Sequence, residues 1–254
     1  AYGRDPLVTV RVATFNGARF LAERSLPSLL AQTHSNWEAW VIGDATQDEA
    51  DRVVADFDDP RLKFFNLPVR GPYPEDPRAL WHIGGVFPAN EAARRARGSW
   101  IAPLDQDDTW DRDHLEVLLN RARDSHAEVV YGRIRLLNQE SGELEGEIGS
   151  WPPTRGQFGW LGAIHHAGLA RFEHTPLAHL ADEPCDWNLC RRLWEAGARF
   201  AFVDQAVATH HWKPRPDQLT TDARLIKELR EWAHDVEEAR DYWRERAEAA
   251  EGGA

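Results

Sequence analysis

Apolar and polar positions in the first part of the chain follow two different periods. Three short segments rich in β-branched or aromatic residues are predicted to be strands: residues 8–13, 38–42 and 61–66. Between the first two, apolar residues recur at helical spacing over residues 21–32, and Pro27 inside that pattern is expected to delay or kink the helix. A polar turn and a second helical pattern precede the third strand. This order predicts an α/β fold with a parallel, doubly wound sheet.

The next part of the chain alternates between loops and further elements. Residues 68–88 are rich in Pro and Gly and are predicted to be a loop, as are residues 150–168. A helix over residues 90–97 is expected to end at Gly98, a candidate C-cap. The later elements are predicted as a strand over 100–104, a helix after 105–115, a strand over 129–137 followed by a turn at 138–147, a helix over 184–196 and a strand over 199–208.

Residues 219–247 are predicted to form one long charged helix. Its apolar residues fall at alternating spacings of four and three. We expect this amphipathic helix to cover the core, and a homodimer formed through its near-heptad stripe is the alternative. Its polar face is rich in Glu and Asp, whereas a helix on a membrane surface carries Lys and Arg.

Composition narrows the classes of partner. The chain has 254 residues and a formal net charge of −12, which argues against a nucleic-acid binder. Two cysteines do not make a disulfide framework, so a reducing, cytoplasmic setting is expected. Apolar runs reach neither the length of a signal peptide nor the roughly 18 residues of a membrane-spanning helix, so no integral membrane segment is expected.

The sequence LDQDD, residues 104–108, carries the strongest chemical signal. It directly follows a predicted strand, and open α/β sheets bind ligands at the carboxyl ends of their strands. Asp105 and Asp107 stand two residues apart and can reach one hard cation, such as Mg²⁺ or Mn²⁺, which is often shared with substrate phosphates. For Asp108, capping of the following helix is an equally good interpretation.

Two further aspartates lie next to predicted elements. Asp44 ends the second strand, where a carboxylate can accept a hydrogen bond from a base N–H such as that of uracil; helix capping by Asp44 or Thr46 is the alternative. Asp186 begins a helix among apolar and aromatic residues, and partial burial would raise its pKa and make it a better base. From the residues alone, helix capping is the favoured role of Asp186.

Two pairs of adjacent histidines complete the candidates. On a strand, neighbouring side chains point to opposite faces, so one member of each pair can point into a site. A structural role is the alternative for each. The pairs are His165–His166 and His210–His211.

Three segments of the chain together resemble family 2 glycosyltransferases. The opening VTVRVATFNGARFLAERSLPSLLAQTHSNWEAWVIGDAT matches that family's strand, Thr-x-Asn turn, helix and second strand ending in an Asp-rich turn. NEAARRARGSWIAPLDQDDTW is similar to its helix–Gly–strand–Asp-x-Asp-Asp segment, and CDWNLCRRLWEAG to its Glu-Asp-Trp helix. The resemblance covers about residues 8–212.

The resemblance implies a single Rossmann-like domain of the A-type glycosyltransferase (GT-A) fold, with a mostly parallel central sheet. It would comprise residues 1–217, with a nucleotide-binding half at about 1–110 and an acceptor-binding half at about 111–217, followed by a helical extension at 218–254. It also implies an inverting, metal-dependent transfer of sugar from a nucleotide-diphosphate donor, by default a UDP-sugar, to a hydroxyl of a saccharide or other acceptor.

The resemblance also implies a role for each matching residue. Thr14 and Asn16 would lie near the nucleotide, Asp44 would bind the base, and Asp105 would help to hold the nucleotide and metal. Asp107 would bind Mn²⁺ or Mg²⁺, with His210 or His211 as a further ligand, and Asp186 would be the general base. His165, His166 and Trp187 would fall on the acceptor side.

This chain departs from the family pattern at three positions. Gly43 and Cys185 stand where the family usually has acidic residues, and Ala89 stands where an arginine is common. The loop predicted over residues 68–88 is expected to supply a substitute for that arginine, from among Arg70, Arg78 and His82. The alternatives to a glycosyltransferase are a non-catalytic nucleotide-sugar-binding relative and a nucleotidyltransferase. A nucleotidyltransferase would normally have a Gly-rich phosphate-binding loop with a basic residue, and the segment FNGAR resembles such a loop only weakly.

Overall fold

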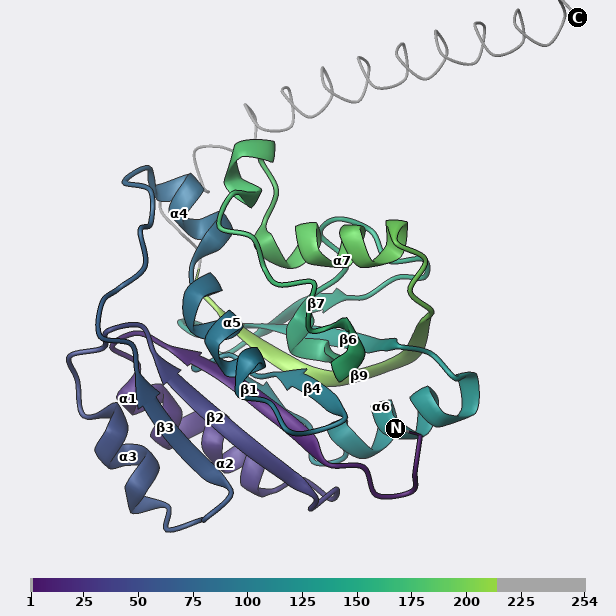
Figure 1. Ribbon diagram of the computed structural model, residues 1–254, viewed down its shortest axis with the longest axis horizontal. Coiled ribbons are helices and arrows are strands. Elements are labelled where there is room, and N and C mark those ends of the chain that lie inside the picture. The colour runs from purple at the N-terminus through teal and green to yellow at the C-terminus, as the bar shows by residue number, and fades with distance from the viewer. Residues whose placement is uncertain (1, 214–254) are drawn as a thin grey trace, which may run out of the picture. The chain divides into compact units, whose positions relative to one another are not determined.

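A computed structural model describes residues 2–213 (Figure 1). Residues Ala1–Trp212 form one compact unit. The predicted helix over 219–247, and with it the proposed dimer contact, lies outside the described residues. Within residues 2–213, no helix has both the length and the apolar character needed to cross a membrane.

The first half of the sheet is parallel, as predicted. Strand β1 (Val8–Thr14) lies between β2 (Trp37–Gly43) and β4 (Trp100–Pro103), and β3 (Leu62–Asn66) pairs with the outer edge of β2. The crossover helix α3 (Ala50–Asp56) joins β2 to β3. Because the four strands run the same way, their carboxyl ends meet at one edge of the sheet.

The helical region after β1 is interrupted at the predicted place. It consists of α1 (Ala18–Phe20), a π-helical turn (Leu21–Ser25) and α2 (Leu26–Leu30). Pro27 cannot donate a backbone hydrogen bond, so the regular helix pattern cannot run through it. The turn instead closes with the longer-range bond from the Leu26 amide to the Leu21 carbonyl.

Two more helices precede β4. The segment predicted as a loop over residues 68–88 contains α4 (Pro77–Ile83) and the start of α5 (Val86–Arg94). Gly98 is not the C-cap of α5, a role that falls to Arg95. A Cβ at Gly98 would lie 2.5 Å from the backbone nitrogen of Thr9, so glycine is needed there for the close approach to β1.

The second half of the sheet is mixed. Strand β8 (Ala163–His166) pairs antiparallel with β4 and with β6 (Val129–Asn138), and β9 (Phe200–Trp212) runs parallel to β6. Strands β5 (Thr109–Trp110) and β7 (Leu144–Ile148) add antiparallel pairs to β9 and β6. The prediction of a loop over 150–168 was therefore wrong where that range contains β8. The prediction of a turn at 138–147 was wrong where that range contains part of β7.

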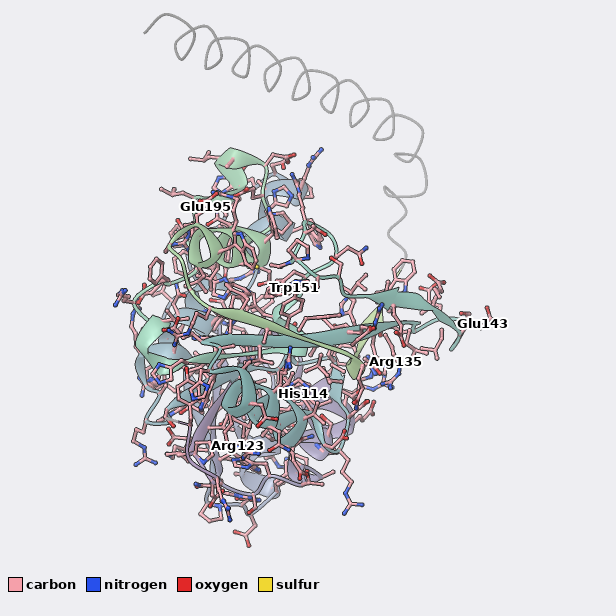
Figure 2. The ribbon with its side chains drawn as sticks, turned by 90° about the vertical axis from the view of Figure 1, so that its right-hand side faces the viewer. His114, Arg123, Arg135, Glu143, Trp151 and Glu195 are labelled. Carbon is pink, nitrogen blue, oxygen red and sulfur yellow. The ribbon has the colours of Figure 1, made fainter. Side chains whose placement is uncertain are left out.

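Helices cover both faces of this half. Alternate residues of β6 point to opposite sides. Val130 and Ile134 pack with Leu115 and Leu118 of α6 (His114–Ser125), whereas Val129 and Tyr131 pack with residues of α7 (Cys185–Glu195). Figure 2 shows these two layers, with His114 and Arg123 of α6 on one side of the strands and Glu195 of α7 on the other. Short 3₁₀ turns lie at Trp160–Gly162, Ala167–Leu169 and Ala178–Ala181.

Candidate active site

The predicted chemistry gathers where β1, β2 and β4 end. Thr14 is the last residue of β1, Asp44 directly follows β2, and Asp105 lies two residues after β4. The amide of Asp44 donates to the carbonyl of Thr14 at 2.8 Å, which ties the first two strand ends together. The parallel topology alone accounts for this convergence.

Thr14 and Asn16 hold the loops at this edge. The Thr14 hydroxyl and the Phe15 amide both donate to the side-chain oxygen of Gln106, at 2.8 and 2.9 Å. The side-chain oxygen of Asn16 accepts a hydrogen bond from the Gln47 amide at 3.0 Å. These contacts fix the turn after β1 against both the acidic segment and the turn after β2.

Asp44 is almost completely buried and only partly satisfied. It is 2% exposed, and its Oδ2 accepts a 2.6 Å hydrogen bond from the Tyr73 hydroxyl. Burial and this carboxylate raise the pKa of Tyr73, so the phenol remains a donor. Within residues 2–213, Oδ1 of Asp44 has no hydrogen-bond partner. A buried acceptor without a partner is costly, and a ligand N–H can satisfy it.

Helix capping does not explain Asp44, because α3 begins at Ala50 with Glu49 at its N-cap. Of the three loop residues expected to replace the missing arginine, Arg70 is the one that reaches Asp44, with its Nε 3.7 Å from Oδ2. The guanidinium of Arg70 also lies 3.8 Å from the centroid of the Phe15 ring. Arg78 instead pairs with Asp182.

Several carboxylates lie close together in the acidic segment after β4. Desolvation, followed by the charges of Asp108, Asp186 and Asp107, raises the pKa of Asp105 to about 7, while Arg11 opposes this rise. The Asp105 side chain is exposed to solvent, so the neighbouring negative charges contribute more to the rise in its pKa than the loss of hydration does. The pKa of Asp107 is raised too, by burial and then by Asp108. Crowded carboxylate oxygens are a donor set that fits a hard divalent cation.

Asp108 organises a histidine and does not cap α6, whose N-cap is Asp113. Its fully buried carboxylate lies 2.9 and 3.1 Å from Nδ1 of His210 and accepts the His211 amide at 2.8 Å. A carboxylate only accepts, so Nδ1 of His210 carries the proton and Nε2 is left to face a ligand. Burial lowers the pKa of His210, but the hydrogen bond and charge of Asp108 outweigh it and raise that pKa to about 9. Near neutral pH the ring therefore also carries a proton on Nε2, and a metal bound there would displace that proton.

The two neighbouring histidines of β9 have different surroundings, as expected on a strand. His210 faces the acidic segment. The Nε2 of His211 lies 3.2 Å from the hydroxyl of Thr109, and its carbonyl accepts from Gln139 at 2.6 Å. Of the two, His210 therefore has the better geometry for a metal or diphosphate ligand.

Asp186 lies in the first turn of α7 but makes no cap, since Pro184 is the N-cap and no side chain bonds the helix end. The favoured capping role was therefore wrong. Burial raises the pKa of Asp186, and Arg11 opposes that rise. The carboxylate side chain is 44% exposed. Its backbone carbonyl accepts from the Trp160 indole at 3.0 Å, which holds this turn in place.

Comparison with known proteins finds a family match in the middle of the chain. Residues 89–171 match the family described as glycosyl transferase family 2. A curated relative is UDP-Glc:alpha-D-GlcNAc-diphosphoundecaprenol beta-1,3-glucosyltransferase WfgD of Escherichia coli, 29% identical over 137 residues, 54% of this chain and 49% of the relative. Another is succinoglycan biosynthesis protein ExoO of Rhizobium meliloti, 32% identical over 145 residues, 57% of this chain and 38% of the relative. The chain thus spans about half the length of these relatives or less.

Solved structures show the fold of this chain. S. aureus TarS in complex with UDP aligns with a TM-score of 0.62 at 18% identity, over 82% of this chain and 61% of the other. The mannosyltransferase PcManGT from Pyrobaculum calidifontis, in complex with GDP-Man and Mn²⁺, aligns with a TM-score of 0.60 at 19% identity, over 83% and 58%. The fold is therefore the GT-A fold that the sequence resemblance implied.

The residues expected on the acceptor side lie in different surroundings. His165 is buried on β8 with its ring 5.4 Å from that of Trp160. His166 stacks on Tyr2, and its ring accepts from the Gly168 amide. Trp187 is half-buried against the cluster that α7 forms with β6. The acceptor role of these side chains stays a prediction.

Sequence reasoning missed two residues near Asp186. Arg11 is the only charged residue in the apolar strand sequence VTVRVA, and a charge there was an available signal. It is 9% exposed and carries its guanidinium into the space between β1 and α7. His174 lies in a segment without a recognisable motif, RFEHTPL, and no pattern marked it.

Proposed function

We propose that this chain is an inverting, metal-dependent glycosyltransferase that moves a sugar from a nucleoside-diphosphate donor, most simply a UDP-sugar, to a hydroxyl acceptor. One observation carries the proposal: a buried carboxylate with an unpartnered oxygen, a crowded acidic segment and a half-exposed carboxylate lie at the end of the sheet where the parallel strands finish. They are Asp44 after β2, Asp105 and Asp107 after β4, and Asp186 at the start of α7.

The unpartnered oxygen of Asp44 suits the N–H of a uracil ring. Its second oxygen is already held by Tyr73, so the carboxylate is fixed before a ligand arrives. The Phe15 ring and the Arg70 guanidinium lie beside it and offer flat surfaces for a base. The names of WfgD and of the TarS structure mention UDP-glucose and UDP, which favours a uridine donor.

Asp107 and Nε2 of His210 are the groups that would hold Mn²⁺ or Mg²⁺, with Asp105 beside them. When bound, such an ion neutralises the charge that develops on the leaving diphosphate. The chain has its own positive groups here as well. The guanidinium of Arg24 donates to the backbone carbonyl of Asp107 at 3.1 Å, and so fixes the segment that carries the metal-binding carboxylate.

Asp186 would accept the proton of the acceptor hydroxyl. As that oxygen attacks the anomeric carbon, the bond from carbon to the diphosphate oxygen breaks, and displacement from the opposite face inverts the centre. The base must be ionised when the acceptor arrives. The guanidinium of Arg11 favours that form, because it lowers the pKa that burial raises.

Calorimetric titration tests the donor site. UDP, GDP and dTDP are titrated with and without Mn²⁺ into the wild type, Asp107→Asn and the control Asp204→Asn, which removes an exposed carboxylate of β9. We expect one nucleotide to bind only with Mn²⁺, in the wild type and the control, and about 10- to 100-fold more weakly in Asp107→Asn. No binding of any nucleotide to folded protein would refute the proposal.

The reaction is tested with UDP-glucose and water as the acceptor. Proton NMR identifies the first anomer of glucose released, and inversion of the α-linked donor gives the β-anomer. Asp186→Asn should keep UDP affinity and lose about 10²- to 10⁴-fold in rate. Unchanged hydrolysis in that variant would exclude Asp186 as the base. UDP binding without turnover in the wild type, with this or other sugar donors, would favour a non-catalytic relative.

A further inference from the structure

A buried histidine, His174, lies next to Asp186 on a segment between two 3₁₀ turns. It is 6% exposed. Asn90 of α5 clamps its backbone from both sides: the Asn90 amide donates to the His174 carbonyl at 2.8 Å, and the His174 amide donates to the Asn90 side-chain oxygen at 2.9 Å. This reciprocal pair fixes His174 in place although it lies outside regular secondary structure.

The contact with Arg11 decides the tautomer of the His174 ring. A guanidinium nitrogen of Arg11 lies 2.8 Å from Nε2 of His174. Arginine has only donors, so Nε2 must accept, and the single proton of the neutral ring must sit on Nδ1. The ring stays neutral because burial, and then the charge of Arg11, hold the pKa of His174 well below its usual range.

The Nδ1–H group points toward the start of α7. Nδ1 has no hydrogen-bond partner among residues 2–213 and lies 4.0 Å from Oδ1 of Asp186. The backbone carbonyl of Cys185 also faces the ring. Both acceptors belong to the first turn of α7, the turn that carries the candidate base. A buried donor without a partner beside a carboxylate is an arrangement that favours a hydrogen bond between them.

The same atoms could be taken for a metal site. One ligand atom each of His174, Cys185 and Asp186 lie within 4.8 Å of one another. A metal at Nδ1 would require its proton to move to Nε2, where it would face the donors of Arg11. The pKa of Cys185 is also raised, by burial and then by Asp186, so the sulfur remains a thiol and a poor ligand. The cluster is therefore built to donate hydrogen bonds.

We propose that His174 is a positioning residue for the base: its Nδ1–H donates to one carboxylate oxygen of Asp186, while Arg11 fixes the tautomer that makes this donation possible. The inference rests on the proposed function of Asp186. The distance of 4.0 Å is longer than a hydrogen bond. The side chain of Asp186 is 44% exposed, and its Oδ1 has only the weak thiol donor of Cys185 at 3.9 Å. Catalytic hydrogen bonds commonly shorten when the substrate is bound. With one oxygen held, the other faces the acceptor.

Nitrogen NMR of the full chain tests the tautomer independently of any activity. Long-range proton–nitrogen spectra distinguish a protonated Nδ1 from a protonated Nε2, and His174→Asn identifies the signal. We expect Nδ1–H at neutral pH in the presence of UDP and diamagnetic Mg²⁺. A protonated Nε2 would overturn the proposal. So would a Co²⁺ complex that shows thiolate-to-metal absorption in the wild type and loses it in His174→Asn, because such a complex needs the Nδ1 lone pair.

Hydrolysis of UDP-glucose tests the role. His174→Asn can place an amide N–H near the position of Nδ1, whereas His174→Leu cannot donate. The control His179→Asn changes a nearby imidazole whose Nδ1 lies 2.8 Å from the Pro176 carbonyl. We expect His174→Leu to lose about 10- to 100-fold in kcat with unchanged KM for UDP-glucose, and His174→Asn and the control to keep most of the rate.

The outcomes separate this inference from the proposed function. Equal losses in the leucine and asparagine variants, or a loss that appears only in KM, would reduce His174 to a structural role. An unchanged kcat in His174→Leu, with Asp186→Asn inactive, would overturn the positioning role and leave the base in place. If Asp186→Asn retains the rate, the proposed base fails first, whatever the tautomer of His174.

Discussion

Replacing Asp108 with asparagine is expected to lower the pKa of His210 by about 0.7 to 1.5 units. The pair is visible as two contacts of 2.9 and 3.1 Å between Nδ1 and a carboxylate that is 1% exposed. The rise in the pKa of His210 from 6.5 to about 9 corresponds to about 3 kcal/mol. Because the His210 side chain is 46% exposed, solvent screening reduces this to about 1–2 kcal/mol.

The pKa of His210 can be read from its ring-proton NMR signals during a pH titration of the metal-free protein. Asp111→Asn is the matched control, since it removes an aspartate of the same loop that pairs with Arg135 at 2.8 Å. The wild type and the control should titrate well above 6.5, and Asp108→Asn nearer to that value. An unchanged pKa in Asp108→Asn would refute the view that Asp108 sets the charge and tautomer of this ring.

Two other variants probe carboxylates buried beside the strands. Burial raises the pKa of Glu38, but hydrogen bonds from Arg97, Lys63 and other donors outweigh it and lower that pKa from 4.5 to about 2. This contribution to stability is present above about pH 4.5 and lost as the pH falls toward 2. Urea unfolding should thus show a cost of about 2–3 kcal/mol for Glu38→Gln at neutral pH and a smaller cost in acid. Tyr73→Phe removes the donor to buried Asp44 and should cost about 1–3 kcal/mol in the same assay, whereas a neutral result would mean that solvent replaces the hydroxyl.

Sequence patterns predicted the parallel half of the sheet because two signals coincide there. Strands β1, β2 and β4 are largely apolar runs, and each ends in a polar turn that carries an aspartate or threonine. Once the strands are parallel, their ends must meet, so the proximity of Asp44 and Asp105 follows from topology. The same reasoning could not find β7 or β8. The first is a largely exposed strand without an apolar face, and the second has only four residues.

The surroundings of Asp186 could not be predicted from the sequence, for a different reason. Its position at the start of a predicted helix suggested a cap, yet the residue at the N-cap is Pro184. The contact between Arg11 and His174 joins positions 163 residues apart. Neither residue type has a preference that points to the other. A buried charge in a strand signals that a partner exists, but the identity of the partner depends on how β8 and α7 return to the sheet.

The raised pKa of Asp105 should make metal binding depend on pH. A carboxylate with a pKa of about 7 is largely protonated below that pH, and a bound cation requires the ionised form. Mn²⁺ binding should therefore release a proton, and the apparent affinity should fall by up to about tenfold for each pH unit below 7. The free-ion EPR signal of Mn²⁺ measures this without nucleotide, whose own phosphate titrates near the same pH. Asp105→Asn should bind more weakly at about pH 8 and lose the proton release that belongs to Asp105, while the release that belongs to the protonated His210 ring remains. Equal wild-type affinity at about pH 5.5 and pH 8 would show that neighbouring charges do not hold this carboxylate in its neutral form, and that the crowding around it is relieved by solvent instead.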